Sequence, residues 1–193
     1  MLTITVDTNI LVDLEAAEPR VAAIQRLLDG AGVNGVKLQL PAIIASERQP
    51  GGRYLDDFDA FLRRAVTVGF SEESLVSPIG CWGVTFWERC LWASEESVAL
   101  ERTIHTILFN NRPYECPEGL GSEFNAAAPH PDYVSWRNAK CDVLVMWCHL
   151  HYRGDVLVTT DANFHKATKK AALLALGANR IIRPDDPDLH RYA

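Results

Sequence analysis

The feature that most constrains the fold is an alternation between short apolar runs and longer segments with helical spacing. Residues 2 to 6, 36 to 40, 155 to 159 and 180 to 183 are short runs that read as strands, and the first and third of them are rich in β-branched residues. The segments between them carry apolar residues three and four positions apart. Alternating strands and helices pack as helices on both faces of a sheet, so we expect a three-layer α/β/α fold with a mainly parallel central sheet.

The periodic segments predict where the helices lie. Helices are expected at residues 10 to 28 with a start at Pro19, 42 to 48, 55 to 62, 86 to 110, 136 to 151 and 164 to 176. Residues 111 to 132 carry four prolines and two glycines, which predicts a long loop. Loops of that length in compact domains are functional or mobile.

The composition is that of a globular protein. The 193 residues suit a single domain, and 48% of them are hydrophobic and 23% charged. Asp7 and Asp13 interrupt the first apolar stretch, and no run of eighteen apolar residues follows. Neither a membrane span nor a signal peptide is expected, and a cytoplasmic location is the simplest prediction. Five cysteines without framework spacing predict reduced, mostly packed thiols.

The net charge limits the possible partners. The chain has 19 basic and 25 acidic residues, which leaves −6 at neutral pH. A protein held to nucleic acid by bulk charge would be basic. The acidity therefore argues against a general coating protein, but it allows an enzyme whose clustered carboxylates are neutralised by metal ions.

Three patterns are better explained by structure than by ligand binding. Residues 30 to 35 match G-x-G-x-x-G but follow a helix and precede a strand, the reverse of a dinucleotide site, so we expect a helix stop and turn. In residues 148 to 151, Cys-His-Leu-His, neighbours in one helical turn point in different directions, which disfavours zinc. Trp82, Trp87 and Trp92 recur every five residues and form no single stripe, so core packing or a subunit contact is expected.

Four carboxylates stand where strands end or helices are expected to begin. Asp7 and Asp161 directly follow apolar runs, Asp142 opens the apolar segment 143 to 147, and Glu47 follows the second run. Taken singly, Asp7 or Asp161 is more often a helix cap, Asp142 an early-turn acid and Glu47 a solvated surface residue. Each of the four, however, is expected at or just after the start of a helix, where it could face one edge of a parallel sheet. Together they predict a cage for a hard cation.

The sequence around these acids resembles that of the PIN domain nucleases, the family that includes VapC-type toxins. Residues 6 to 11, Val-Asp-Thr-Asn-Ile-Leu, are similar to the family's opening strand motif, and residues 141 to 145 to its third-acid helix. Residues 159 to 164, Thr-Thr-Asp-Ala-Asn-Phe, resemble its last-acid motif, and Glu47 suits its second acid. The resemblance implies one PIN-like domain over residues 1 to 193. The middle, about residues 67 to 138, is longer than in compact members.

The resemblance implies hydrolysis of phosphodiester bonds, usually in RNA, with Mg²⁺ or Mn²⁺. Asp7, Asp142 and Asp161 would bind the principal ion, directly or through water, while Glu47 would complete the cage or position the attacking water. The side chains expected to orient these acids by hydrogen bonds are Thr8, Asn9 and Thr160.

The same resemblance suggests partners. A toxin role predicts a small antitoxin protein that covers the acidic groove, and a homodimer is a further expectation. RNA contacts are expected at the loop 111 to 132 and at Lys166, Lys169 and Lys170, although a solvated surface is the ordinary role of any single lysine.

Two alternatives stay open. A haloacid-dehalogenase-like phosphatase also starts with an aspartate after a strand, but it requires a second acid two positions on, where this chain has Asn9. A PIN-like module could also keep the fold and serve as a non-catalytic binding or scaffold protein.

Overall fold

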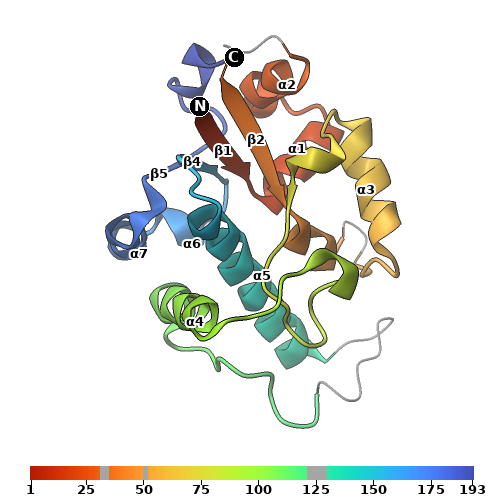
Figure 1. The fold of residues 1–193 in the computed structure, drawn as a ribbon, viewed down its shortest axis with the longest axis vertical. Coiled ribbons are helices and arrows are strands. Elements are labelled where there is room, and N and C mark those ends of the chain that lie inside the picture. The colour runs from red at the N-terminus through yellow and green to blue at the C-terminus, as the bar shows by residue number, and fades with distance from the viewer. Residues whose placement is uncertain (31–34, 50–51, 121–129) are drawn as a thin grey trace.

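The central sheet is entirely parallel. The computed structural model describes residues 1–30, 35–49, 52–120 and 130–193. In these residues five strands pair in the order β3-β2-β1-β4-β5 (Figure 1). The strands are β1 (Leu2–Val6), β2 (Val36–Pro41), β3 (Leu75–Val76), β4 (Val156–Val158) and β5 (Arg180–Ile182). The predicted α/β class with a parallel sheet is confirmed.

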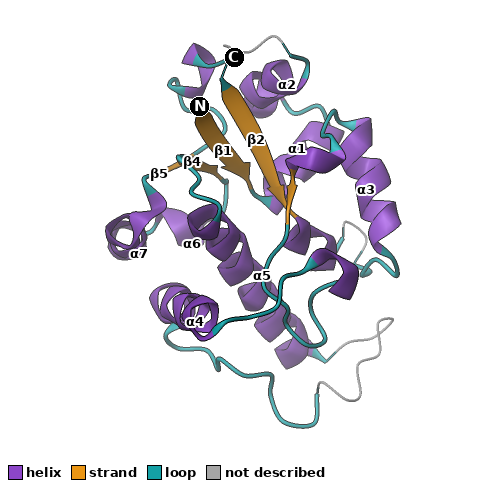
Figure 2. Cartoon of the chain, viewed as in Figure 1, coloured by secondary structure: helices purple, strands orange, loops and turns teal. Residues whose placement is uncertain are grey.

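Helices form the outer two layers, as Figure 2 shows. The helices between β1 and β3 are α1 (Thr8–Glu15), α2 (Ala22–Leu28) and α3 (Phe58–Thr67). Those between β3 and β5 are α4 (Glu95–Phe109), α5 (Pro131–His151), α6 (Ala162–His165) and α7 (Ala167–Leu173). Parallel strands joined by right-handed crossovers place helices on opposite faces when the chain changes direction along the sheet. The first group accordingly lies on one side of the sheet, and the second group packs together on the other.

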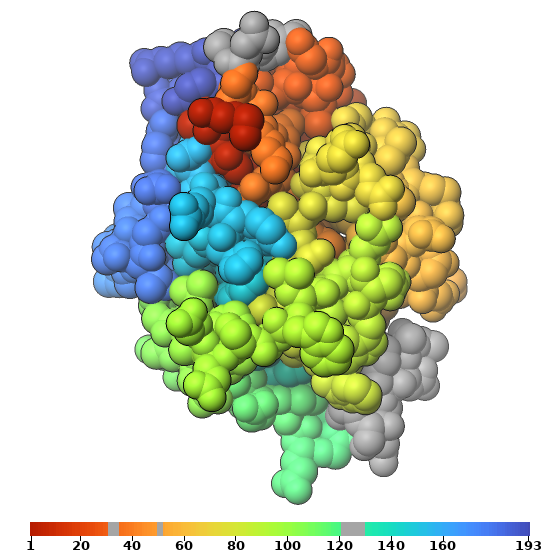
Figure 3. Space-filling view, in the orientation of Figure 1, coloured from red at the N-terminus to blue at the C-terminus, as the bar shows by residue number. Residues whose placement is uncertain are grey.

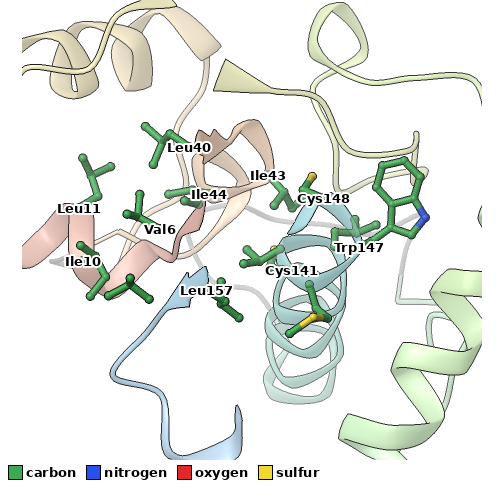
Figure 4. Close-up of a cluster of buried hydrophobic side chains, with 14 of the residues drawn as sticks. Val6, Ile10, Leu11, Leu40, Ile43, Ile44, Cys141, Trp147, Cys148 and Leu157 are labelled. Carbon is green, nitrogen blue, oxygen red and sulfur yellow. The ribbon is translucent and has the colours of Figure 1, made fainter. Parts of the chain in front are cut away.

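The core lies between the sheet and the helices. Helix α5 supplies Cys141, Trp147 and Cys148, all fully buried, and β1 supplies Val6 (Figure 4). Burying a large apolar side chain contributes about 1.5–3 kcal/mol, so a helix buried along most of its length is a main source of stability. In Figure 3 the green segments, from the middle of the chain, cover the lower part of the molecule, and the yellow ones lie on its right side.

Several element boundaries differ from those predicted. Residues Ala42–Ser46 form a 3-10 helix, so Glu47 lies beyond its end in extended backbone. The helix expected over 86 to 110 begins only after Ser94, whose capping box with Ser97 fixes the start of α4. The two-residue strand β3 was not predicted, because it is too short to show a periodic pattern.

The last two expected helices also start or continue differently. Helix α5 begins at Pro131, five residues before the predicted start, because proline is favoured in the first turn. The segment predicted as one helix over 164 to 176 divides at Lys166, whose backbone is extended. It then continues through a π-helical turn that contains Gly177, at φ 109°. Residues 111 to 120 form no helix or strand, in keeping with the predicted loop, and residues 121 to 129 lie outside the described part of the chain.

The glycine-rich segment 30 to 35, residues 148 to 151 and the tryptophans were each expected to have a structural role. Gly30 and Gly35 take positive φ values on either side of residues 31 to 34, which lie outside the described residues. His149 is fully buried and bonds Thr5 and the carbonyl of Ala178, which is a structural role. Core packing of the tryptophans was wrong for Trp82 and Trp92, which are 83% and 95% exposed, and the alternative, a subunit contact, stays a prediction. Within the described residues, no helix has the length and apolar character needed to cross a membrane.

Candidate active site

The order of the strands creates a crevice between β1 and β4. The chain leaves β1 toward β2 and β3, then returns to place β4 on the other side of β1. In open α/β sheets, ligands bind outside the carboxyl ends of strands at such a switch point. Asp7 directly follows β1 and Thr159 directly follows β4; because Val6 pairs with Val158, these next residues lie side by side.

Asp7 is held rigidly at the mouth of this crevice. It is the N-cap of α1, and its Oδ1 accepts a hydrogen bond from the backbone N–H of Thr8 at 2.7 Å. Its Oδ2 accepts from Asn9 Nδ2 at 3.0 Å and from Thr159 Oγ1 at 2.6 Å. Burial raises the pKa of Asp7 in spite of these donors, and the charge of Asp161 raises it further. Asp7 therefore caps a helix and also lies in the candidate site.

Glu47 reaches the crevice from the neighbouring strand connection. Its backbone is extended beyond the 3-10 helix that follows β2. The hydroxyl of Thr8 donates a hydrogen bond to Glu47 Oε1, which ties the second acid to the residue after the first. Burial, and then the negative charge of Asp7, raises the pKa of Glu47 to about 8.

Asp142 occupies a different position on its helix from the one expected. The expectation of an early-turn acid was wrong, since α5 begins at Pro131 and Asp142 lies in its middle. There it receives no help from the helix N-terminus, and no hydrogen bond or ion pair to its carboxylate occurs among the described residues. Burial, followed by the charges of Glu47 and Asp7, raises its pKa well above the ordinary value.

Asp161 completes the set at the end of β4. It is the N-cap of α6, and its Oδ1 accepts from the backbone N–H of Asn163 at 2.8 Å. Together the four acids line one open depression of about 450 Å³, to which Thr8, Asn9, Val12, Asp13 and Arg20 also contribute. Arg20 is the basic residue of this lining, and its guanidinium is bound to Asp13 at 2.5 Å. Within the described residues, the four acids therefore face one another without an ion-pair partner.

Thr159 is the residue that sequence reasoning missed. Its hydroxyl donates to Asp7 and accepts from the backbone N–H of Asp161 at 2.9 Å, so it joins two of the acids. Thr160, which was expected to do this, instead contributes its backbone N–H, which donates to Asn9 Oδ1 at 3.0 Å. The register of β1 and β4 was the missing information, because a Thr-Thr pair alone does not show which hydroxyl faces the neighbouring strand.

The backbone around Glu47 is anchored from two sides. Arg137 on α5 is buried and donates through Nε to the carbonyl of Ser46 at 2.9 Å. Gln49 donates to the carbonyl of Glu47 itself at 2.7 Å, and Arg64 on α3 donates to Gln49 in turn. These contacts give a loop residue the fixed position that a functional carboxylate requires.

The three lysines expected to contact RNA do not line the depression. Lys166 is exposed and Lys170 is half-buried. Lys169 donates to the carbonyl of Leu108 and, at 2.6 Å, to Asn163 Oδ1, which ties α7 to the end of α4. An RNA contact at these lysines stays a prediction, and for Lys169 a structural role is already visible.

The donor set fits a hard divalent cation in its chemistry. Carboxylate oxygens are the ligands that Mg²⁺ prefers, and a cation would offset the burial and, after it, the mutual repulsion that raise these pKa values. The side chains do not converge tightly: in the described part of the chain, no group of three or more histidine, cysteine, aspartate or glutamate residues is arranged to hold a metal ion.

Comparisons with known proteins add no family assignment. No protein-family model matches the chain, and neither a curated protein nor a solved structure matches it.

Proposed function

We propose that this protein is a divalent-metal-dependent endoribonuclease of the PIN type, which hydrolyses RNA phosphodiester bonds. The supporting observation is that four carboxylates, each from a different part of the chain, line one depression at the switch point of a parallel sheet without a paired cation. Uncompensated buried charge is costly, so its presence at the usual ligand-binding edge favours a functional explanation.

The cofactor in this proposal is Mg²⁺ or Mn²⁺, held by Asp7, Asp142 and Asp161. Such an ion supplies a Lewis acid for a phosphoryl oxygen and acidifies a bound water. Asp7 is already oriented by three hydrogen bonds, and Thr159 and Asn9 perform that orientation.

Glu47 has the chemistry of a proton acceptor. Thr8 occupies its Oε1, which leaves Oε2 to orient an attacking water and take its proton. Without a metal ion, burial and the charge of Asp7 raise the pKa of Glu47 to about 8; a bound cation would offset the charge of Asp7 and favour the ionised carboxylate, the form that accepts a proton. Arg20 uses Nε and Nη2 on Asp13, so its Nη1 remains for a substrate phosphate at the rim.

The biological setting belongs to the same proposal. The acidic depression would be covered by a small antitoxin protein when the enzyme is held inactive, and the site of action would be the cytoplasm. Contacts to RNA from Lys166 and Lys170, and assembly as a homodimer, complete the proposed partners.

The test is cleavage of a mixed-sequence RNA by the purified chain with Mn²⁺, with Mg²⁺ and with EDTA. We expect cleavage with either ion, none with EDTA, and none from the double variant Asp7→Asn with Asp142→Asn. The matched control changes two exposed aspartates on the surface, Asp56→Asn with Asp59→Asn, and should cleave normally. A folded Asp7/Asp142 variant that still cleaves RNA would place the chemistry elsewhere.

Two further measurements separate the alternatives. A haloacid-dehalogenase-like phosphatase would release phosphate from a small ester and form a covalent adduct on Asp7. A non-catalytic scaffold would show no rise in melting temperature with Mn²⁺, whereas a carboxylate cage gains stability on binding the ion.

A further inference from the structure

The middle of the chain encloses a second cavity, separate from the acidic depression. Its volume is about 370 Å³, within the range of small-molecule sites, and its lining residues all lie between positions 79 and 144. Helix α5 separates the two sites: Asp142 faces the depression, whereas Lys140 lines the cavity. Residues two apart on a helix point in nearly opposite directions, which explains this division.

The centre of the cavity wall is a buried ion pair. The side chains of Lys140 and Glu101 are only 6% and 4% exposed, and Nζ lies 2.7 Å from Oε1. The Tyr114 hydroxyl donates to the other oxygen of Glu101. Burying two charges is expensive, and packed apolar residues would often be as stable, so the pair calls for a reason other than stability.

In the buried ion pair the unused hydrogen-bonding capacity consists of donors on Lys140, whereas the other two charged residues of the lining, Arg102 and Glu115, are exposed and lie 4.0 Å apart. The Lys140 ammonium has three N–H groups, and Glu101 takes one of them. The ammonium also lies 3.9 Å from the centre of the Tyr114 ring and 5.9 Å from that of Trp136. Both oxygens of Glu101 already accept hydrogen bonds. A ligand that fits this wall must therefore bring an acceptor to Lys140 and an apolar surface to the rings.

We propose that this cavity binds a small planar aromatic molecule that carries an acceptor oxygen, either a carbonyl or a carboxylate. The oxygen accepts from Lys140, and the ring packs beside Trp136, because Lys140 and the Arg102 guanidinium, 4.3 Å from the ring centre, already lie over the Tyr114 ring. Trp82, 83% exposed and also part of the lining, stands where the cavity meets the surface. This site does not depend on the proposed nuclease activity, because it uses none of the four acids.

Three matched probes test the chemistry on the full chain by saturation-transfer NMR. Benzamide offers a carbonyl, benzoate a carboxylate, and benzylamine the same ring with a cation and no acceptor oxygen. We expect benzamide or benzoate to bind at least tenfold more tightly than benzylamine, and the tighter of the two identifies the acceptor. Equal binding of all three probes, or binding of none, overturns the proposal.

Two variants place the binding in the cavity. Cys116→Phe adds a ring to the lining and keeps the ion pair, and it should weaken the tighter probe at least tenfold. The control Val66→Phe adds a ring on an exposed face of α3 and should leave binding unchanged. The paired change Lys140→Met with Glu101→Gln removes both charges together and should abolish the preference over benzylamine. If both phenylalanine variants bind alike, or the charge-free variant keeps the preference, the site is wrong.

Discussion

Helix α5 carries two charged side chains into opposite kinds of surroundings. Asp142 enters a depression with three other acids and no paired cation, and burial with these neighbours raises its pKa. Lys140, two residues earlier, enters an aromatic cavity and meets one acid at 2.7 Å. The first set is destabilised by the burial and mutual repulsion of its charges, whereas the second is neutral as it stands.

Breaking the ion pair between Lys140 and Glu101 should lower the free energy of unfolding substantially. In Lys140→Met the Glu101 carboxylate loses its cation while still buried, so we expect the free energy of unfolding to fall by about 3–5 kcal/mol. Urea denaturation measures this, with Lys37→Met on the exposed face of β2 as a control that changes little. Lys140→Met with Glu101→Leu should lose much less, because no charge is left unpaired. A loss within 1 kcal/mol for Lys140→Met alone would mean that the pair is solvated.

RNA cleavage by the four acids should depend on the hydroxyl of Thr159. Thr159→Val keeps the shape of the side chain but removes its bonds to Asp7 and to the N–H of Asp161. We expect RNA cleavage to slow by about 10–100-fold, as when the hydrogen-bond partners of metal ligands are lost. Thr159→Ser should restore most of the rate. The adjacent Thr160→Val is the matched control, since its contribution is made by the backbone; equal losses at both positions would contradict the assignment.

The acidic set should also make the fold less stable as pH rises. Glu47 has an ordinary pKa of 4.5, raised to about 8 in the folded chain. Between these values the folded chain holds a proton that the unfolded chain has released, so this stability is present below pH 4.5 and is lost as pH rises through about 8. Asp7 and Asp142, whose pKa values are also raised, act in the same direction.

The free energy of unfolding can fall by up to about 1.4 kcal/mol for each pH unit and each proton that the folded chain holds in excess. Denaturant unfolding between pH 6.5 and 8.5 with EDTA measures it; below that range, burial lowers the pKa of His149, which opposes the trend. Glu47→Gln should flatten the curve, and the exposed control Glu73→Gln should not. A curve that rises with pH in this window would show that the acids are compensated.

The two regions also differ in how far the sequence reveals them. Asp7 and Asp161 follow strand-like runs, and the edge at which parallel strands end is fixed by the fold class, so their meeting was predictable. Lys140 and Glu101 meet because α4 packs on α5, and no local pattern encodes that pairing. The exposed tryptophans escaped prediction for the same reason, since composition does not show whether a partner surface covers a side chain. Thr159 required the register between two distant strands.

Neutralising Asp142 should change the free energy of unfolding only slightly, but the direction of the change is informative. Asp142→Asn removes a charge from the acidic set at nearly constant shape, so without metal it should raise the free energy of unfolding. We expect a gain of about 1 kcal/mol, the ordinary size of the effect of one substitution, because burial and the charges of Glu47 and Asp7 raise the pKa of Asp142 and disfavour its ionised form. Glu101→Gln, the same kind of change on the other side of α5, should instead destabilise the protein, because it strands Lys140. Melting curves at pH 8 with EDTA compare the two. The two changes in stability must have opposite signs if Asp142 is kept for a ligand and Glu101 for the fold. With Mn²⁺ the native chain should become more stable than Asp142→Asn, because only the native chain keeps all four carboxylates for the ion.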